Sequence, residues 1–366
     1  MRVSVTGSDG FLAWHVRCAL GTRQVNDVIS IGRSAFQDAT LMDSALAEVD
    51  CVIHLAGVNR ATDQEIATTN PMLARLLAEG LVRAGRPINV IHGNSIHSRG
   101  DSVFGQSKAE VASILRATCE VTGGSFVDVV LPNVFGEHGR PFYNSVVATF
   151  CHQLAIGEKP AIDVDRELPL IHAQTVAEIL LNAVANPIES EILVEGRVLS
   201  VSEVLEKLQV ISEPYFEGRL PDLSDSFTRD LFNTYRSYTF PEMWPILPIK
   251  HSDDRGELVE AVRGAGGETQ VFFSSTKPGF TRGNHYHLRK VERFLVLNGQ
   301  ASIRLRRLFT DEVIEFNVNG ETPAIIDMPT LWTHSITNTG DRDLLTLFYA
   351  DDEFNPDDPD TYWIAV

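Results

Sequence analysis

The chain has 366 residues, of which 43% are hydrophobic and 22% charged, a composition typical of a globular protein with two domains. Its formal net charge of −18 argues against nonspecific nucleic-acid binding, because that binding needs a basic surface to neutralise phosphates. No apolar run is long enough to cross a bilayer, so we expect no membrane span. The 4 cysteines are widely separated and typical of reduced core residues, so we expect a cytoplasmic protein.

The first stretch of the chain has the order strand, glycine turn, helix. Residues 2–6 form a short β-branched run, which leads through Gly7-Ser-Asp-Gly10-Phe-Leu-Ala13 into a helical stretch from Trp14 to Leu20. In a dinucleotide-binding unit, the first glycine permits the tight turn and the second lets the backbone approach a pyrophosphate, which rests on the helix N-terminus. The pattern therefore predicts that Gly7 and Gly10 contact a dinucleotide.

The next two strands predict which dinucleotide is bound. Residues 28–31 form a second strand, and Gly32-Arg33 follows at a place where Asp or Glu commonly selects NAD. Arg33 favours the 2′-phosphate of NADP, although a plain surface arginine is the other interpretation. A third strand, residues 50–54, ends in Leu55-Ala-Gly57, where the adenosine end of the cofactor would pass. Strands that alternate with helices in this way predict an α/β domain with a doubly wound parallel sheet.

These segments resemble the extended short-chain dehydrogenase/reductases that act on nucleotide sugars. The matching motifs are Thr6-Gly-x-x-Gly10-Phe11, His54-Leu-Ala-Gly57, Ser95, the helix that bears Lys108, and Pro132-Asn-Val-Phe-Gly136. The resemblance implies a Rossmann fold and NADP(H) bound by Gly7, Gly10, Phe11, Arg33, Leu55, Ala56, Gly57, Lys108 and Pro132. It also implies catalysis by a Ser with a Tyr-x-x-x-Lys, in which the tyrosine phenol protonates the forming alkoxide and the lysine lowers the pKa of that phenol.

One position in the catalytic group departs from the family. Ser95 and Lys108 match, but Phe104 stands where Tyr is expected, and phenylalanine has no ionisable group. Loss of a positioned acid typically costs about 10²–10⁴-fold in rate. Three explanations stay open: reduction is lost or strongly reduced, which we favour; another group supplies the proton; or Phe104 is an engineered change. The polar neighbours that are candidates for the second explanation are His92, His97 and Ser102.

The second half of the chain contains a candidate metal site. From about residue 249 short strands recur at regular spacing with Gly-containing turns, which predicts an antiparallel jelly-roll barrel. His285 and His287 are two apart, so on a strand they share a face, and Glu292 and His334 follow later in the chain. Three imidazoles and a carboxylate suit zinc or another divalent metal. Surface histidines beside an ordinary ion-pairing glutamate are the alternative.

The segments around these residues resemble the two motifs of the cupin family. His285, His287 and Glu292 take the ligand places of the first motif, and His334 takes that of the second. The second motif departs from the family at Leu331, where Gly is usual, so this turn must form with a side chain present.

We expect a Rossmann domain at residues 1–245 and a cupin domain at residues 246–366. Between about residues 213 and 248 the chain is rich in Pro and aromatic residues and too apolar for a flexible linker. The two domains in this order resemble a family of bifunctional capsular polysaccharide synthesis enzymes over almost the whole chain. The resemblance implies that the cupin epimerises C3 of a UDP-linked 4-keto-6-deoxy-N-acetylhexosamine, that the Rossmann domain reduces the C4 ketone with NADPH, and that the protein is a homodimer.

The chemistry limits which residues can act. Epimerisation next to a ketone needs a base, an acid on the opposite face and a stabilised enolate oxygen. The predicted catalytic positions are Ser95, Phe104, Lys108 and His287, although a histidine that ligates a metal is not a free base. We expect a UDP- or dTDP-linked 4-keto sugar as substrate. A metal-binding sugar-nucleotide sensor or scaffold without reductase activity is the alternative from another class.

Overall fold

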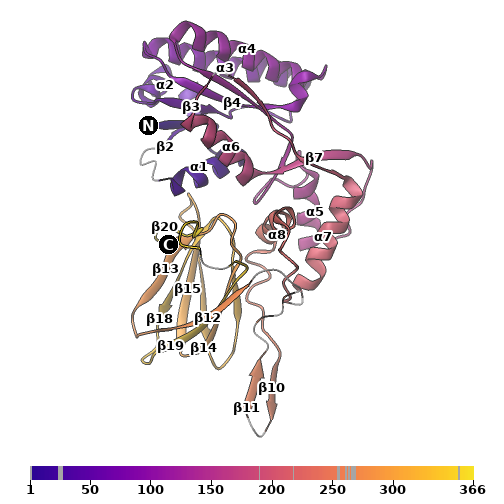
Figure 1. Ribbon diagram of the computed structural model, residues 1–366, viewed down its shortest axis with the longest axis vertical. Helices are drawn as coiled ribbons and strands as arrows, with labels where there is room; N and C mark the ends of the chain where they lie inside the picture. The colour runs from indigo at the N-terminus through magenta and orange to yellow at the C-terminus, as the bar shows by residue number, and fades with distance from the viewer. Residues whose placement is uncertain are drawn as a thin grey trace. The chain divides into compact units, whose positions relative to one another are not determined.

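The computed structural model describes residues 2–366 except 24–27, 189, 217, 254–255, 260–261, 263, 265–268 and 353–354. The chain forms two compact units, each with its own sheets (Figure 1). The first comprises residues 1–135, 139–146 and 164–201, and the second comprises residues 136–138, 147–163 and 202–366.

The first unit is built on a 6-stranded parallel sheet in the order β2-β1-β3-β4-β5-β8. Its strands are β1 (Val3–Thr6), β2 (Val28–Ile31), β3 (Cys51–His54), β4 (Asn89–Ser95), β5 (Phe126–Leu131) and β8 (Ser190–Leu193). One face is covered by α1 (Phe11–Thr22) and α6 (Ala173–Ala185), and the other by α2 (Ala39–Leu46), α3 (Asp63–Ala84) and α4 (Val103–Thr122) (Figure 1). This arrangement confirms the predicted doubly wound α/β fold.

Local sequence explains where these elements begin and end. All residues of β5 are buried, as expected for a strand covered by helices on both faces. Helix α3 starts with a capping box between Thr62 and Glu65 and ends at Gly85, which has φ of 64°. Short 3-10 turns follow two strands: η1 (Arg33–Phe36) after β2 and η2 (Ile96–Arg99) after β4. A small separate sheet contains β6 (Asn133–Phe135), β7 (Glu167–His172) and β9 (Arg197–Ser200).

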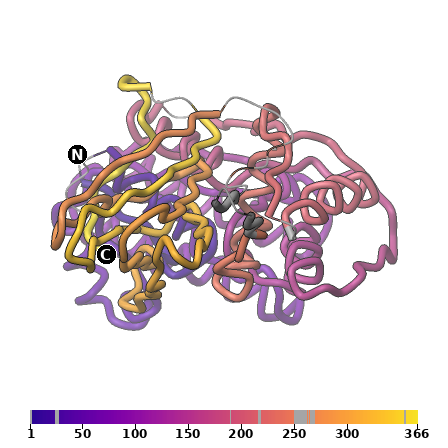
Figure 2. Tube along the Cα trace, turned by 90° about the horizontal axis from the view of Figure 1, so that it is seen from below, coloured from indigo at the N-terminus to yellow at the C-terminus, as the bar shows by residue number. Residues whose placement is uncertain are grey.

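Among the described residues, the second unit contains two larger antiparallel sheets besides a two-stranded one. One has the order β12-β19-β14-β17, with β12 (Gln270–Thr276), β19 (Leu344–Ala350), β14 (Glu292–Asn298) and β17 (Ile325–Met328). The other has the order β16-β15-β18-β13-β20, with β16 (Val313–Asn319), β15 (Gln300–Arg307), β18 (Trp332–Asn338), β13 (Thr281–Tyr286) and β20 (Tyr362–Trp363). Figure 2 shows yellow strands from the end of the chain interleaved with orange strands. The cupin-like fold is as predicted, but these strands form two sheets without closing into one barrel.

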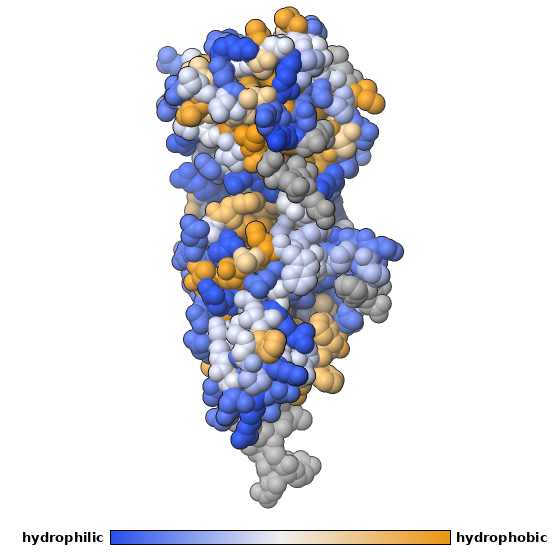
Figure 3. Space-filling view, turned by 90° about the vertical axis from the view of Figure 1, so that its left-hand side faces the viewer, coloured by the Kyte–Doolittle hydropathy of each residue, from blue (hydrophilic) through white to orange (hydrophobic). Residues whose placement is uncertain are grey.

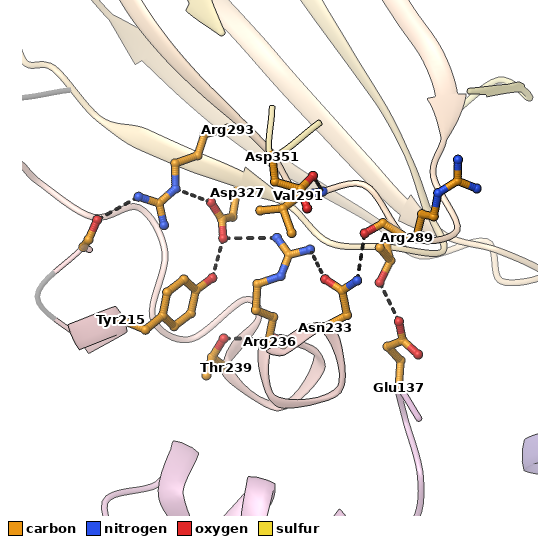
Figure 4. A network of polar contacts seen from close by, with 12 residues as sticks. Glu137, Tyr215, Asn233, Arg236, Thr239, Arg289, Val291, Arg293, Asp327 and Asp351 are labelled. Atoms are coloured by element: carbon orange, nitrogen blue, oxygen red, sulfur yellow. Dashed lines mark hydrogen bonds and ion pairs between the residues drawn. The ribbon is translucent and has the colours of Figure 1, made fainter. Parts of the chain in front are cut away.

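Three helices and a hairpin complete the described part of the second unit. The helices are α5 (Val146–Ala155), α7 (Val201–Phe216) and α8 (Ser226–Thr239), and the hairpin pairs β10 (Lys250–Asp253) with β11 (Gly256–Val259). Buried charges tie α7 and α8 to the sheets (Figure 4). The Asp327 carboxylate on β17 accepts hydrogen bonds from Arg293 Nε at 2.6 Å and Arg236 at 3.3 Å, and the Tyr215 hydroxyl donates to the same group.

The segment that carries these contacts lies in the second unit. Residues 202–245 belong to the second compact unit, and the expected domain boundary between residues 245 and 246 stays a prediction. The apolar segment from about 213 to 248 is therefore packed in its described part, as its composition predicted.

The surface and the cysteines agree with the composition. The face drawn in Figure 3 is mostly hydrophilic, with apolar areas interrupted by polar side chains. All four cysteines are buried and none is in a disulfide. Within the described part of the chain, every helix is too short or too polar to cross a membrane. A cytoplasmic location stays a prediction.

Candidate functional site

The glycine turn after β1 presents a helix N-terminus at the carboxyl edge of the parallel sheet. Gly7 has φ of 65°, and a Cβ there would lie 2.9 Å from the Cα of Ala56, so only glycine fits. Gly10 is the N-cap of α1, and Phe11 is the first helical residue. The positive end of this helix dipole attracts phosphate, as the predicted dinucleotide site requires.

The loop after β3 lies beside this turn. Thr6 Oγ1 accepts hydrogen bonds from the backbone N–H groups of Leu55 and Ala56, each at 3.1 Å. Gly57 follows in the same loop. The structure thus brings Gly7 together with residues 55–57, all four of which were predicted to bind the cofactor.

Two further predicted cofactor residues lie at the same edge of the sheet. Arg33 opens η1 directly after β2 and is exposed. Pro132 follows β5, which is separated from β3 by β4. Ligands of doubly wound sheets bind at the carboxyl ends of the strands, so both positions suit binding, and their roles stay predictions.

Ser95 and Phe104 lie on either side of the turn η2. Ser95 ends β4, and its hydroxyl accepts the N–H of His97 at 3.3 Å. A Cβ on Gly105 would clash with the carbonyl oxygen of His97, so the start of α4 packs directly against the turn. The Phe104 ring lies 6.3 Å from the His97 ring, measured between centroids. Position 104 therefore sits at the predicted catalytic place but offers no hydroxyl.

Lys108 belongs to a polar network inside the first unit. Its ammonium donates to the Gly93 carbonyl at 2.7 Å and lies 3.3 Å from His92 Nε2. His92 Nδ1 lies 3.0 Å from one oxygen of Asp128, and Asn94 donates to the other at 2.9 Å. We did not predict Asp128 or Asn94 from the sequence. The available signal was a lone acidic residue in the otherwise apolar β5, because a buried carboxylate needs partners.

Burial and neighbouring charges shift the pKa values of this network. Burial lowers the pKa of Lys108 to about 8, against the attraction of Asp128. Burial also lowers the pKa of His92 to about 4. Burial alone would raise the pKa of Asp128, but His92, Asn94 and Lys108 together bring it below its ordinary value. Near neutral pH the network therefore holds a carboxylate, a neutral imidazole and a largely protonated amine.

In the second unit, the four predicted metal ligands converge. His285 on β13 and His334 on β18 lie opposite each other in the antiparallel pair, with ring centroids 4.6 Å apart. Glu292 opens β14, and its Oε2 lies 3.0 Å from His287 Nε2 and 3.4 Å from His334 Nε2. One ligand atom from each of the four residues lies within 4.8 Å of all the others.

This donor set fits a divalent metal ion. Tetrahedral ligands around zinc lie about 3.4 Å apart, so small side-chain movements suffice for coordination. His285 Nδ1 is buried without a hydrogen-bond partner among the described residues, a costly state that a cation would relieve. Burial lowers the pKa of His285 to about 3 and also lowers that of His334, which keeps both imidazoles neutral and able to ligate.

The C-terminal segment orients one of these ligands. His287 Nδ1 makes a hydrogen bond with the backbone carbonyl of Asp360, which directs Nε2 toward Glu292. The Asp360 carboxylate accepts three backbone N–H groups of the turn after His287, from residues 288, 289 and 290, at 3.0, 3.0 and 2.8 Å. Such outer contacts fix the tautomer and the ring of a metal ligand. We missed Asp360 because it lies 73 residues from His287 in the sequence.

Leu331 makes the turn of the second cupin motif with its side chain in place, as expected. It has φ of 66°, a strained conformation for a residue other than glycine. Its N–H donates to the His287 carbonyl at 2.8 Å, and its side chain is fully buried. Hydrophobic burial therefore offsets the backbone strain beside the ligand set.

Comparison with protein families gives two matches. Residues 3–194 match the NAD dependent epimerase/dehydratase family. Residues 251–362 match the polysaccharide biosynthesis C-terminal domain. The described metal-ligand cluster lies inside the second match, and the glycine turn and the Lys108 network lie inside the first.

Individual relatives cover both parts. The chain is 32% identical to UDP-2-acetamido-2,6-beta-L-arabino-hexul-4-ose reductase of Pseudomonas aeruginosa, over 100% of this chain and 99% of that protein. It is 27% identical to the spore coat polysaccharide biosynthesis protein SpsL of Bacillus subtilis, over 31% of this chain and 80% of that protein. The crystal structure of the capsular polysaccharide assembling protein CapF from Staphylococcus aureus covers 100% of both chains, with 30% identity and a TM-score of 0.62. The predicted resemblance to bifunctional enzymes of the CapF type is confirmed over the whole chain.

Proposed function

Because this chain belongs to the NAD dependent epimerase/dehydratase family and is a nucleotide-sugar enzyme, we propose that it acts twice on one 4-keto sugar nucleotide. The cupin-like unit epimerises C3 of a UDP-linked 4-keto-6-deoxy-N-acetylhexosamine. The Rossmann unit reduces the C4 ketone with NADPH, at a rate that Phe104 keeps low. The printed name of the P. aeruginosa relative, a reductase of a UDP-linked hexulose, supports UDP over dTDP as the nucleotide.

The convergence of His285, His287, Glu292 and His334 is the observation that carries the proposal. These residues would hold zinc or another divalent ion. When bound, this ion would act as a Lewis acid on the ketone oxygen at C4, the carbon next to C3. His287 was predicted both as a ligand and as a catalytic residue. The ligand role suits its geometry, because Nδ1 bonds to the Asp360 carbonyl and Nε2 faces Glu292, which leaves no nitrogen for a substrate proton.

The proposed cofactor of the first unit is NADP(H). The turn from Gly7 to Phe11 and the loop at residues 55–57 would hold its phosphates and its adenosine end. Arg33 supports NADP over NAD, because it is exposed after β2 at the place where an acidic residue would repel a 2′-phosphate. Ser95 and Lys108 would face the C4 ketone, and Phe104 would contact it without exchanging a proton.

A second copy of the chain is the proposed partner. Strand β12 is at the end of its sheet among the described strands. Val271, Phe272 and Phe273 on it are 51%, 41% and 72% exposed. An exposed apolar edge strand invites pairing with another chain, and the homodimer is the simplest such assembly. Light scattering should therefore give twice the chain mass, and Phe273→Lys should reduce it to the monomer.

The deciding experiment is isotope exchange at C3. In D₂O without NADPH, the protein should introduce one deuterium at C3 of a UDP-linked 4-keto-6-deoxy-N-acetylhexosamine, read by NMR and mass spectrometry. His285→Gln should lose exchange and bound metal together, whereas His152→Gln, a half-buried histidine on α5, should keep both. Metal binding without exchange on UDP- and dTDP-linked 4-keto sugars would favour the sensor or scaffold instead.

A further inference from the structure

A row of buried polar side chains crosses the parallel sheet of the first unit. His54 on β3, His92 on β4 and Asp128 on β5 are neighbours in register. They are 1%, 0% and 4% exposed, and the rest of β3 and β5 is apolar. Buried polar groups weaken a core unless they are satisfied, so such a row calls for a role beyond packing. The ammonium of Lys108 on α4 lies 3.3 Å from Nε2 of His92, the middle residue of this row.

The hydrogen-bond directions in this row follow from its carboxylate. Asp128 only accepts, so the hydrogen of the neutral His92 ring lies on Nδ1, toward Asp128. The Nε2 lone pair then faces Lys108 at 3.3 Å, and the Gly93 carbonyl accepts a second hydrogen at 2.7 Å. An ammonium group has three N–H bonds. Two of them have these partners, and within the described part of the chain the third remains for a ligand.

Lys108 lies four residues after Phe104 on α4, so the two side chains share one face of the helix. The lysine is therefore the nearest charged donor along this helix face to the position that lacks a phenol. We propose, on the basis of the reductase function proposed above, that Lys108 itself protonates the C4 carbonyl oxygen and that His92 and Asp128 position it. When the reduced nicotinamide supplies hydride to C4, the C=O π electrons move to oxygen. The oxygen takes a proton from Nζ, and the neutral amine regains one from water.

The charges that face Lys108 suit this role. Burial lowers its pKa to about 8, so it gives up a proton more readily than an ordinary lysine, while Asp128 keeps it largely charged near neutral pH. His92 and His54 face the same space and are neutral, because burial lowers the pKa of both. Asp128 is therefore the group that sets the charge of Lys108.

Asp128→Asn tests the positioning role without changing the shape of the side chain. Asn94 still donates to the oxygen of residue 128, so the new amide points its N–H at His92 Nδ1 and forces the hydrogen onto Nε2. The N–H on His92 Nε2 then points at the ammonium of Lys108, and since both groups are donors, the hydrogen bond between them is lost. Glu110→Gln is the matched control, because it removes an exposed carboxylate from the same helix without touching the network.

The first readout needs no cofactor or substrate. Acylation of Lys108 by a limiting anhydride, followed across pH by mass spectrometry, should show half-labelling near pH 8 in the wild type. It should shift to lower pH in Asp128→Asn and stay unchanged in Glu110→Gln. Equal labelling curves in all three proteins would overturn the positioning role.

The second readout is NADPH-dependent reduction. Asp128→Asn should lower kcat by about tenfold or more and move the alkaline limb of the pH profile to lower pH, with unchanged NADPH affinity. Phe104→Tyr in the Asp128→Asn background should restore the rate, because a phenol then supplies the proton.

A wild-type rate in Asp128→Asn, or a loss of rate in His97→Gln instead, would overturn the inference. Reduction by Phe104→Tyr but not by the wild type would overturn it and leave the reductase function standing. No reduction by either would instead refute the reductase function.

Discussion

Phe104 lacks the phenol hydroxyl with which a tyrosine at this position would act as a general acid. Phe104 and Lys108 lie one turn apart on α4, and Ser95 ends the neighbouring strand β4. A phenol at position 104 would ionise more readily beside the Lys108 ammonium, as a proton donor near neutral pH requires. Position 104 therefore lacks the hydroxyl that the reduction proposed above would use.

Phe104→Tyr should therefore raise the rate of NADPH-dependent C4 reduction, by less than the effect of a positioned acid, which is about 10²–10⁴-fold, because Lys108 already supplies a proton. The decrease in NADPH absorbance with a UDP-linked 4-keto sugar measures this rate. Phe104→Leu is the control and should bring no gain, because it changes the packing without adding a hydroxyl. A tyrosine variant that binds NADPH normally but reduces no faster would contradict this account of position 104.

Asp360→Ala should weaken metal binding by about 10–100-fold, although Asp360 is not itself a ligand. Its carboxylate holds the three N–H groups of the turn after His287, and its carbonyl orients the His287 ring. Competition with a chromophoric chelator measures the affinity. Asp357→Ala, an exposed change in the same segment, should have no effect. Equal affinities in the two variants would mean that the turn holds its shape without Asp360.

Residues with local signals were predictable and those with distant partners were not. The two-residue spacing of His285 and His287 indicated a shared face of one strand, and the structure has both at the ligand cluster. Asp360 and Asp128 act through chain segments far away in sequence. No spacing rule identifies such partners, although a lone acid in an apolar strand signals that one exists.

At the scale of elements, the β13–β18 pair carries two of the four candidate metal ligands. His285 faces His334 across this pair, and the register shifts between Gly283 and His285. The strands themselves were predictable from their spacing and turns. Their division into two sheets was not, because it depends on long-range pairing such as that of β14 with β19 and β17.

Asp327 connects α7 and α8 to the sheets of the second unit. Asp327→Asn should lower the free energy of unfolding of this unit by about 3–5 kcal/mol, because it leaves Arg236 and Arg293 buried without the carboxylate that pairs with them. Tryptophan fluorescence in urea measures this, because Trp244, Trp332 and Trp363 lie in that unit.

Asp358→Asn is the matched control for this prediction. It breaks the ion pair between Asp358 and Arg289, whose side chains are 59% and 35% exposed, respectively. Because this pair is largely exposed, the urea midpoint should change little. An Asp327→Asn variant as stable as this control would show that the helices dock through apolar contacts alone.

At the scale of the whole molecule, sequence families and compact units divide the chain differently. The two family matches end at residue 194 and begin at residue 251. The structure assigns residues 202–250 between them to the second unit. The boundary expected at residue 245 followed the change from helices to strands and stays a prediction, while the buried charges of α7 and α8 connect these helices to the second unit.

This division predicts which ligand stabilises which part. Zinc should raise the unfolding temperature of the second unit, and NADPH should raise that of the first. At a free concentration of a hundred times its Kd, each ligand should add about 2.7 kcal/mol to the free energy of unfolding of its unit. Scanning calorimetry of the full chain should resolve two transitions, each moved by one ligand. In His285→Gln the zinc shift should vanish and the NADPH shift should remain, because His285 lies in the second unit. A single transition moved equally by either ligand would mean that the two units unfold together in one cooperative step. Both ligands would then add to the same free energy of unfolding.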